Sequence, residues 1–275
     1  MELEIVRANP AGNITILTLT PLENREQRTA AANALLANPD LQAEQAGFVL
    51  PRSPGQLPRL EMMGGEFCGN AARSFGLFIA KERGLQGRGE LDVSISGAGK
   101  PLRTRFDLDA GTASAEIPFP QDRRELRFQD RPLTVYTFEG ISHVIVPEQA
   151  PGPELFSAIR ARFEEDCGRL NLPLPDALGV MFWEPASAMM SPAVYVYGTA
   201  SLVFESSCGS GSAALGLSLA EGFQDGTHTY AIAQRGGLIE TTVEKHAGTL
   251  RRLSIGGPVT LSGRMRVRCE TAAQS

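Results

Sequence analysis

The sequence predicts an α+β fold made of two similar lobes that face each other. Strand-like segments with alternating apolar residues outnumber helix-like segments along the chain. Each half also contains a cysteine–glycine turn that leads into an alanine-rich helix, GGEFCGNAARSFG at residues 64–76 and ESSCGSGSAALG at residues 205–216. Two matching turns about half a chain apart indicate an internal repeat.

In the first half, two helices are predicted among short strands. Residues 24–36 carry apolar side chains at helical spacing. Residues 69–82 are rich in helix formers and contain no proline, and Gly84 provides a stop. The strands predicted in this half are residues 3–8, 14–19, 47–52, 59–63, 90–96, 101–109 and 112–119.

The second half repeats this plan. Helices are predicted at residues 153–166 and from the second cysteine–glycine turn to about residue 222. The strands predicted in this half are residues 133–138, 142–147, 179–184, 193–198, 201–205, 229–234, 238–244, 249–255 and 259–269.

A charged segment with several prolines, residues 118–132, separates the halves and predicts a domain boundary near Pro118 to Arg124. We therefore expect an N-terminal lobe that carries Cys68 and a C-terminal lobe that carries Cys208, with the last strand returning to the first lobe. The expected bounds are residues 1–118 with 263–275 for the N-terminal lobe and residues 119–262 for the C-terminal lobe.

Composition narrows the class of protein. The chain has 275 residues, 42% of them hydrophobic, which is enough for a sizeable core. A net charge of -5 argues against nucleic acid or a membrane surface as a partner. No apolar run approaches the roughly 20 residues of a membrane helix, and the acidic N-terminus is unlike a secretory signal. Four cysteines are too few for a disulfide scaffold, so free thiols and a cytoplasmic location are expected.

A cysteine at a helix start has unusual chemistry. The first N–H groups of a helix lack partners inside it and carry the positive end of its dipole, so they hold carboxylates and favour a thiolate. Glycine allows a ligand to approach the backbone closely, and asparagine or serine adds polarity there. The residues predicted to contact a ligand in this way are Gly69, Asn70, Gly209 and Ser210.

Two opposed turns can invert a stereocentre. One thiolate takes the Cα proton from one face of an amino acid, and the thiol on the other face supplies a new proton. We therefore predict Cys68 and Cys208 as the catalytic bases, titrating as a coupled pair. A single free cysteine is ordinarily a small buried hydrophobe, and Cys167 and Cys269, which lack such surroundings, are interpreted in that way.

No metal or cofactor site is predicted. The three histidines are far apart in the sequence, and no CxxC or HxxxH spacing occurs. The glycine-rich segments match neither a phosphate-binding loop nor a dinucleotide fingerprint. No lysine has a recognisable pyridoxal setting.

The two turns resemble the catalytic motifs of the diaminopimelate epimerase superfamily, over nearly the whole chain. The resemblance implies cofactor-independent racemase or epimerase activity on a small amino acid. It also implies two pseudo-symmetric lobes, each a mostly antiparallel sheet wrapped around a central helix, with the active site in the cleft between them. It favours a homodimer, and it places Asn13 of NPAGN and His143 of GISHVIVP near the substrate.

A narrower resemblance is to the histidine racemases of opine-type metallophore biosynthesis. NPAGNITIL, EQAGFV, GGEFCGN and ESSCGSG carry it. The superfamily's arginine before the second cysteine is missing here, and so is the asparagine before the first motif. The residues that would bind the second amino-acid group of diaminopimelate are therefore absent. L-histidine to D-histidine is the predicted reaction. Glu44 and Glu205 are then candidates to bind the amino group or an imidazole. A solvated charge for these glutamates and a structural role for His143 are the alternatives.

Three other functions stay open at this point. Diaminopimelate or another amino acid could be the substrate of the same reaction. A non-enzymatic amino-acid or opine binding protein would use the same helix starts without needing two sulfurs. A thiol–disulfide redox role would instead cycle the two cysteines through a disulfide.

Overall fold

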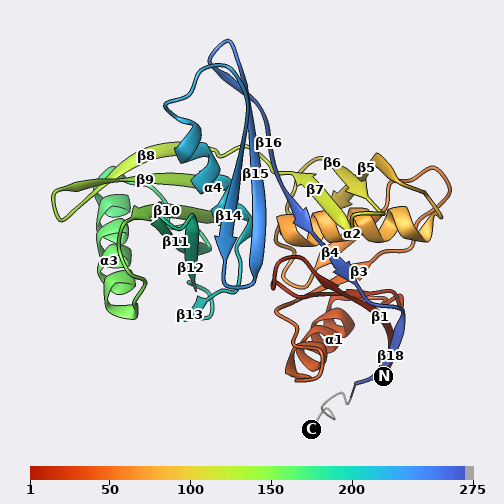
Figure 1. Ribbon diagram of the computed structural model, residues 1–275. Helices are drawn as coiled ribbons and strands as arrows, with labels where there is room; N and C mark the ends of the chain where they lie inside the picture. Colours follow the sequence, from red (N-terminus) through yellow and green to blue (C-terminus); the bar gives the residue numbers. More distant parts are fainter. Residues whose placement is uncertain (270–275) are drawn as a thin grey trace, which may run out of the picture. The chain divides into compact units, whose positions relative to one another are not determined.

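The computed structural model describes residues 1–269, which form four helices and eighteen strands (Figure 1). The predicted α+β class is confirmed. The chain divides into two compact units. The first contains Met1–Glu116 and the chain from Ile255 on, and the second is Ile117–Ser254. Of the expected N-terminal lobe, residues 270–275 lie outside the described part of the chain.

The first unit contains two helices, α1 (Arg25–Ala37) and α2 (Gly69–Glu82). Its strands are β1 (Glu2–Asn9), β2 (Thr15–Thr18), β3 (Gln45–Val49), β4 (Arg59–Met62), β5 (Arg88–Ile95), β6 (Leu102–Asp107), β7 (Thr112–Glu116), β17 (Thr260–Leu261) and β18 (Met265–Arg268). Strand β1 pairs antiparallel with β2 and also with β17 and β18. Strands β17 and β18 therefore complete the sheet that β1 begins.

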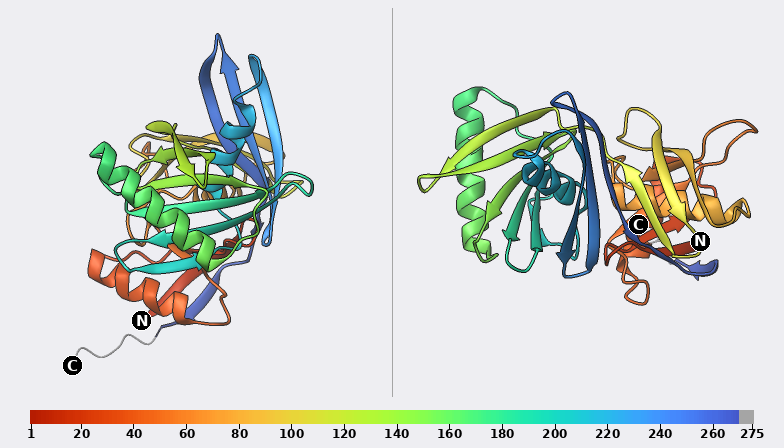
Figure 2. Two further views of the ribbon diagram at one scale, coloured as in Figure 1. Left: turned by 90° about the vertical axis from the view of Figure 1, so that its left-hand side faces the viewer. Right: turned by 45° about the horizontal axis from the view of Figure 1, so that its top comes forward.

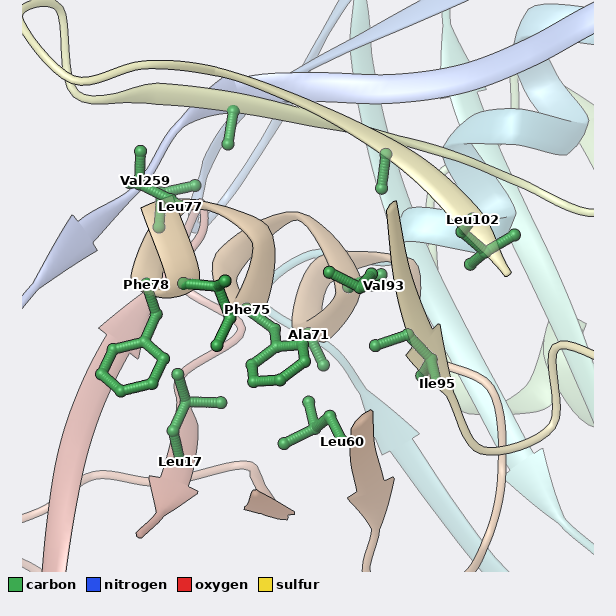
Figure 3. Close-up of a cluster of buried hydrophobic side chains, with 14 of the residues drawn as sticks. Leu17, Leu60, Ala71, Phe75, Leu77, Phe78, Val93, Ile95, Leu102 and Val259 are labelled. Carbon is green, nitrogen blue, oxygen red and sulfur yellow. The ribbon is translucent and has the colours of Figure 1, made fainter. Parts of the chain in front are cut away.

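Helix α2 is the centre of the first unit. Residues 69–80 of this helix are all buried, because strands lie around it. Phe75 and Phe78 pack toward Leu17 on β2, and Val93 lies on the β5 side (Figure 3). A helix that is buried on every side needs small and apolar residues all round, which the alanine-rich run supplies.

The second unit has the same kind of central helix, α4 (Gly209–Ala220), and a second helix, α3 (Pro153–Leu170). Its strands are β8 (Asp122–Phe128), β9 (Arg131–Phe138), β10 (Ile141–Pro147), β11 (Ala177–Glu184), β12 (Met189–Val196), β13 (Ser201–Phe204), β14 (Gly226–Gln234) and β15 (Gly237–His246). Strand β16 (Thr249–Pro258) begins in the second unit and ends in the first.

Side chains on the two faces of β10 pack against different helices. Val144 and Val146 share a core with Phe156 and Phe163 of α3, which covers this face of the sheet (Figure 2). His143 points to the other face, where it contacts α4. Because successive strand residues alternate between faces, the strand places one histidine under the second cysteine–glycine turn.

The two central helices share a packing device. Gly76 in α2 and Gly216 in α4 each lie eight residues after the cysteine. A Cβ at Gly76 would collide with the side chain of Thr104, and one at Gly216 with that of Thr241. Glycine at these positions lets strand and helix approach closely, which supports the repeat predicted from the sequence.

The structure corrects three local predictions. The charged segment expected at the domain boundary contains strand β8, a hairpin partner of β9 in which only Leu126 is buried. Helix α3 runs to Leu170, four residues beyond the predicted end. The strand predicted at residues 259–269 is divided into β17 and β18. None of the helices in residues 1–269 is long and apolar enough to cross a membrane.

Candidate active site

Cys68 is the N-cap residue of α2. Its backbone is extended (φ -132°, ψ 113°), and its Sγ accepts a hydrogen bond from the Ala71 N–H at 3.4 Å. The residue is half-buried. A sulfur that accepts from the first turn of a helix is stabilised as a thiolate by that N–H group and by the helix dipole.

A chain of side-chain amides runs beside this sulfur. Asn70 Nδ2 donates to Asn13 Oδ1 at 3.4 Å, and Asn13 Nδ2 donates to Glu44 Oε2 at 2.9 Å. Asn13 Oδ1 also lies 4.0 Å from Cys68 Sγ. Asn13 and Asn70 are buried, whereas Glu44 is exposed. The predicted residues Asn13, Glu44, Cys68 and Asn70 are therefore brought together in the first unit.

Arg73 extends this group, although no sequence motif identified it. Its side chain is fully buried, Nε donates to Asn70 Oδ1 at 3.1 Å, and Nη1 donates to Pro258 O at 3.2 Å. Burial lowers the pKa of Arg73 to about 10, while negative charge at Cys68 acts in the opposite sense. The signal in the sequence is a single charged residue, Arg73, in the buried stretch of the helix at residues 69–80.

Cys208 is the N-cap residue of α4 with nearly the same backbone conformation (φ -126°, ψ 115°). A buried glutamine fixes its turn. Cys208 N donates to Gln234 Oε1 at 2.8 Å, Gln234 Nε2 donates to Ser212 Oγ at 2.9 Å, and Ser212 Oγ donates to Cys208 O at 2.7 Å. Neither Gln234 nor Ser212 was predicted from the sequence, because both act only through tertiary contacts.

The second sulfur has the opposite electrostatic surroundings. Cys208 is 7% exposed, and burial raises the pKa of its thiol well above the usual value. The Glu205 carboxylate adds to this rise in the Cys208 pKa. The Ser210 hydroxyl and the Gly211 N–H lower the Cys208 pKa, but burial outweighs them. Burial and the Glu205 carboxylate, which affect this pKa most, therefore both favour a neutral thiol at Cys208.

His143 contacts the first turn of α4, next to Cys208. Its Nε2 lies 2.9 Å from Ser210 Oγ, and Ser210 Oγ lies 3.7 Å from Cys208 Sγ. His143 is completely buried, and burial lowers its pKa to about 3. The imidazole is therefore neutral at ordinary pH and contacts the sulfur only through the serine. The predicted residues His143, Glu205, Cys208 and Ser210 are brought together in the second unit.

The remaining cysteines lie elsewhere. Cys167 belongs to the core beneath α3, and Cys269 to the core beside α1. None of the four cysteines forms a disulfide. Within residues 1–269, no three His, Cys, Asp or Glu side chains are grouped so that they could hold a metal ion.

Comparisons with known proteins identify relatives of this chain. A family model described as the histidine racemase CntK N-terminal domain matches residues 2–267. A histidine racemase of Fusobacterium nucleatum is 29% identical over 264 residues, which cover 94% of both chains. A histidine racemase of another strain of that species is 31% identical over 79% of this chain and 80% of its own.

A solved structure shows the same fold. A probable proline racemase from Agrobacterium radiobacter superimposes with a TM-score of 0.62 at 12% identity, covering 98% of this chain and 93% of its own. The range matched by the family model, residues 2–267, contains both cysteine–glycine turns of this chain. The chain therefore belongs to the histidine racemase CntK family.

Proposed function

We propose that the protein inverts the α-carbon of an amino acid, with Cys68 and Cys208 as the two bases. The observation that carries this proposal is that the central helix of each unit begins at an N-cap cysteine that is not in a disulfide. Racemisation needs one group that removes the Cα proton and another that returns a proton to the opposite face. Two cysteines in equivalent turns can supply these two groups.

The proposed reaction has two proton transfers. The thiolate of one cysteine takes the Cα–H proton and becomes a thiol, which leaves a carbanion conjugated with the substrate carboxylate. The thiol of the other cysteine then gives its proton to the opposite face of Cα and becomes a thiolate. Atoms and charge balance, and the enzyme finishes with its two protonation states exchanged. The mechanism requires both sulfurs to reach one Cα from opposite sides.

Backbone and side-chain groups at the two turns would hold the substrate. The N–H groups at the starts of α2 and α4, at Gly69 and Gly209, suit a carboxylate. Glu44 is exposed at the end of the amide chain, and Glu205 is half-buried beside Cys208. These carboxylates suit a protonated amino group or an imidazole, so both sides of a cationic amino acid have a candidate partner.

Histidine is the proposed substrate. The two relatives described above are named histidine racemases and cover most of this chain. An exposed and a half-buried glutamate are also more suited to an imidazole than to a second carboxylate, which disfavours diaminopimelate. A homodimer and the supply of D-histidine for an opine-type metallophore stay predictions from the family resemblance, and a cytoplasmic location stays a prediction from the cysteine content.

The test is a panel of L-amino acids incubated with the full chain and analysed by chiral chromatography. The panel contains histidine, LL-diaminopimelate, proline and lysine. We expect D-histidine to form fastest and without added cofactor. Faster turnover of LL-diaminopimelate would reassign the substrate. Binding of histidine, measured by calorimetry, with no inversion of any amino acid would contradict the enzymatic proposal and favour a binding protein.

A further inference from the structure

The feature that calls for an explanation is the charge of Arg73. The side chain has no exposed surface and lies in α2, the helix that forms the core of the first unit. Burying an unpaired guanidinium is costly, so such groups ordinarily have full hydrogen bonding and a counter-charge. Among the described residues, Arg73 Nη2 has no hydrogen-bond partner. Its Nε and Nη1 bond only to neutral oxygens.

Arg73 also fixes the direction of the amide chain. A guanidinium can only donate, so Asn70 must turn Oδ1 toward Arg73 and Nδ2 toward Asn13. Asn13 must then accept through Oδ1, which leaves its Nδ2 to donate to Glu44. The orientation of three side chains therefore follows from one buried arginine.

A Cys68 thiolate would supply the charge that compensates Arg73. Negative charge on this sulfur stabilises the protonated guanidinium. The interaction is mutual, so the guanidinium stabilises the Cys68 thiolate to the same extent. The Ala71 N–H donates to the same sulfur at 3.4 Å. Asn13 Oδ1, an acceptor that favours the thiol, is farther away at 4.0 Å.

Other charged groups near the Cys68 turn are on its solvent side. Glu66 lies two residues before the cysteine, and its carboxylate accepts from Gly64 N. Glu44 is separated from the sulfur by Asn13. Both glutamates are exposed, so solvent screens their effect on Cys68 more than it screens the buried guanidinium.

We propose that Arg73 is the positioning residue of the Cys68 turn. Its buried guanidinium makes Cys68 the thiolate of the resting enzyme, and it orients the chain of Asn70, Asn13 and Glu44. Cys68 releases its proton to solvent in this state, and Cys208 remains a thiol. This inference rests on the proposed racemase function and specifies which cysteine acts first as base: the resting enzyme is ready for the enantiomer whose Cα–H faces Cys68.

The experiment is the pH dependence of Cys68 alkylation by iodoacetamide, followed at the Cys68 peptide by mass spectrometry in the full chain. We expect the midpoint in the native protein to lie below the ordinary thiol value of about 8.5. In Arg73→Gln the midpoint should rise by roughly one pH unit or more, because the nearby positive charge is lost. Arg83→Gln is the matched control, since it removes an exposed arginine just beyond the same helix, and its midpoint should not change.

Arg73→Lys separates charge from orientation and also serves if Arg73→Gln does not fold. It keeps the positive charge, so the Cys68 midpoint should stay near the native value. Lysine cannot make the several directed hydrogen bonds of a guanidinium, so the chain of Asn70, Asn13 and Glu44 loses its fixed orientation. KM for histidine should therefore rise several-fold, while the pH profile of kcat is retained.

A native midpoint at or above about 8.5, or equal midpoints in native protein and Arg73→Gln, would overturn the inference. The alkylation measurement needs no turnover. A lowered midpoint without racemisation would therefore contradict the proposed function alone, and racemisation with an ordinary midpoint would contradict the role of Arg73 alone.

Discussion

The residues around the two sulfurs differ more than the two backbone turns do. Cys68 is half-buried, accepts from a helix N–H and has a buried arginine nearby. Cys208 is almost completely buried, and Glu205 adds negative charge. One turn thus favours a thiolate and the other a thiol, which is the pair of protonation states that a two-base racemase needs at rest.

The buried histidine gives a prediction about stability. His143 has a folded pKa of about 3, against about 6.5 in the unfolded chain. The unfolded state therefore binds a proton that the folded state excludes. Stability from this group is complete above about pH 6.5 and is lost as pH falls toward 3, at up to about 1.4 kcal/mol per pH unit. We expect His143→Gln to weaken this pH dependence of the unfolding free energy.

Urea unfolding between pH 7 and pH 4 measures this difference. The carboxylates titrate in both proteins, so the difference between the two slopes isolates the histidine. His246→Gln is the control because His246 is exposed, and its slope should match the native slope. Equal slopes for the native protein and His143→Gln would show that His143 is not neutral when folded.

Repeated local patterns in the sequence are enough to predict the two proposed catalytic cysteines. The positions of Cys68 and Cys208 at helix starts follow from the glycine that comes after each and the helix formers beyond it. Arg73 and Gln234 could not be assigned in the same way. Each is one polar residue whose partner lies far away in the sequence, at Pro258 and Cys208 respectively. Their roles depend on tertiary packing, which a local pattern does not specify.

At the scale of elements, the central helices depend on one glycine each. In α2, a Cβ at Gly76 would lie 2.5 Å from Thr104 Oγ1. Thr104 is fully buried and donates to Leu91 O at 2.9 Å, so it cannot move aside without losing that bond. Gly76→Ala should therefore lower the unfolding free energy by about 1–3 kcal/mol, despite the better helix propensity of alanine.

Gly168→Ala provides the matched comparison. Gly168 lies in α3 with open space around its Cα, so alanine there should leave stability unchanged or raise it by up to about 1 kcal/mol. Thermal unfolding of the two variants beside the native protein gives both values. A Gly76→Ala protein as stable as Gly168→Ala would contradict the close packing of α2 on β6.

Elements with strong periodicity were predicted well, and the exceptions have physical causes. The bounds of α2 agree with the prediction, because its composition and its glycine stop act together. Strand β8 was overlooked because it buries only Leu126 and exposes charged side chains such as Arg123, so its sequence is typical of a loop. Strand β8 forms because its backbone pairs with β9, and the side chains of β8 give no sign of that pairing in the sequence.

At the scale of the whole molecule, the chain is divided into two units that share a plan. Each contains a buried central helix, a cysteine at its N-cap and a glycine eight residues later. Strand β16 connects them, pairing with β15 and with β7, and the chain then returns to β1 through β17 and β18. Each unit supplies one sulfur, so the proposed reaction depends on both.

The most direct test of the two-base claim follows deuterium in each enantiomer of histidine early in the reaction. In deuterated water each cysteine sulfur holds at most one exchangeable proton. We expect the product enantiomer to carry deuterium at Cα from the start, while the remaining substrate keeps its protium, in both directions of the reaction. Cys68→Ser and Cys208→Ser should each abolish inversion. Early appearance of deuterium in recovered substrate at the same rate as in product, or product that retains the substrate's protium, would contradict two opposed cysteine bases.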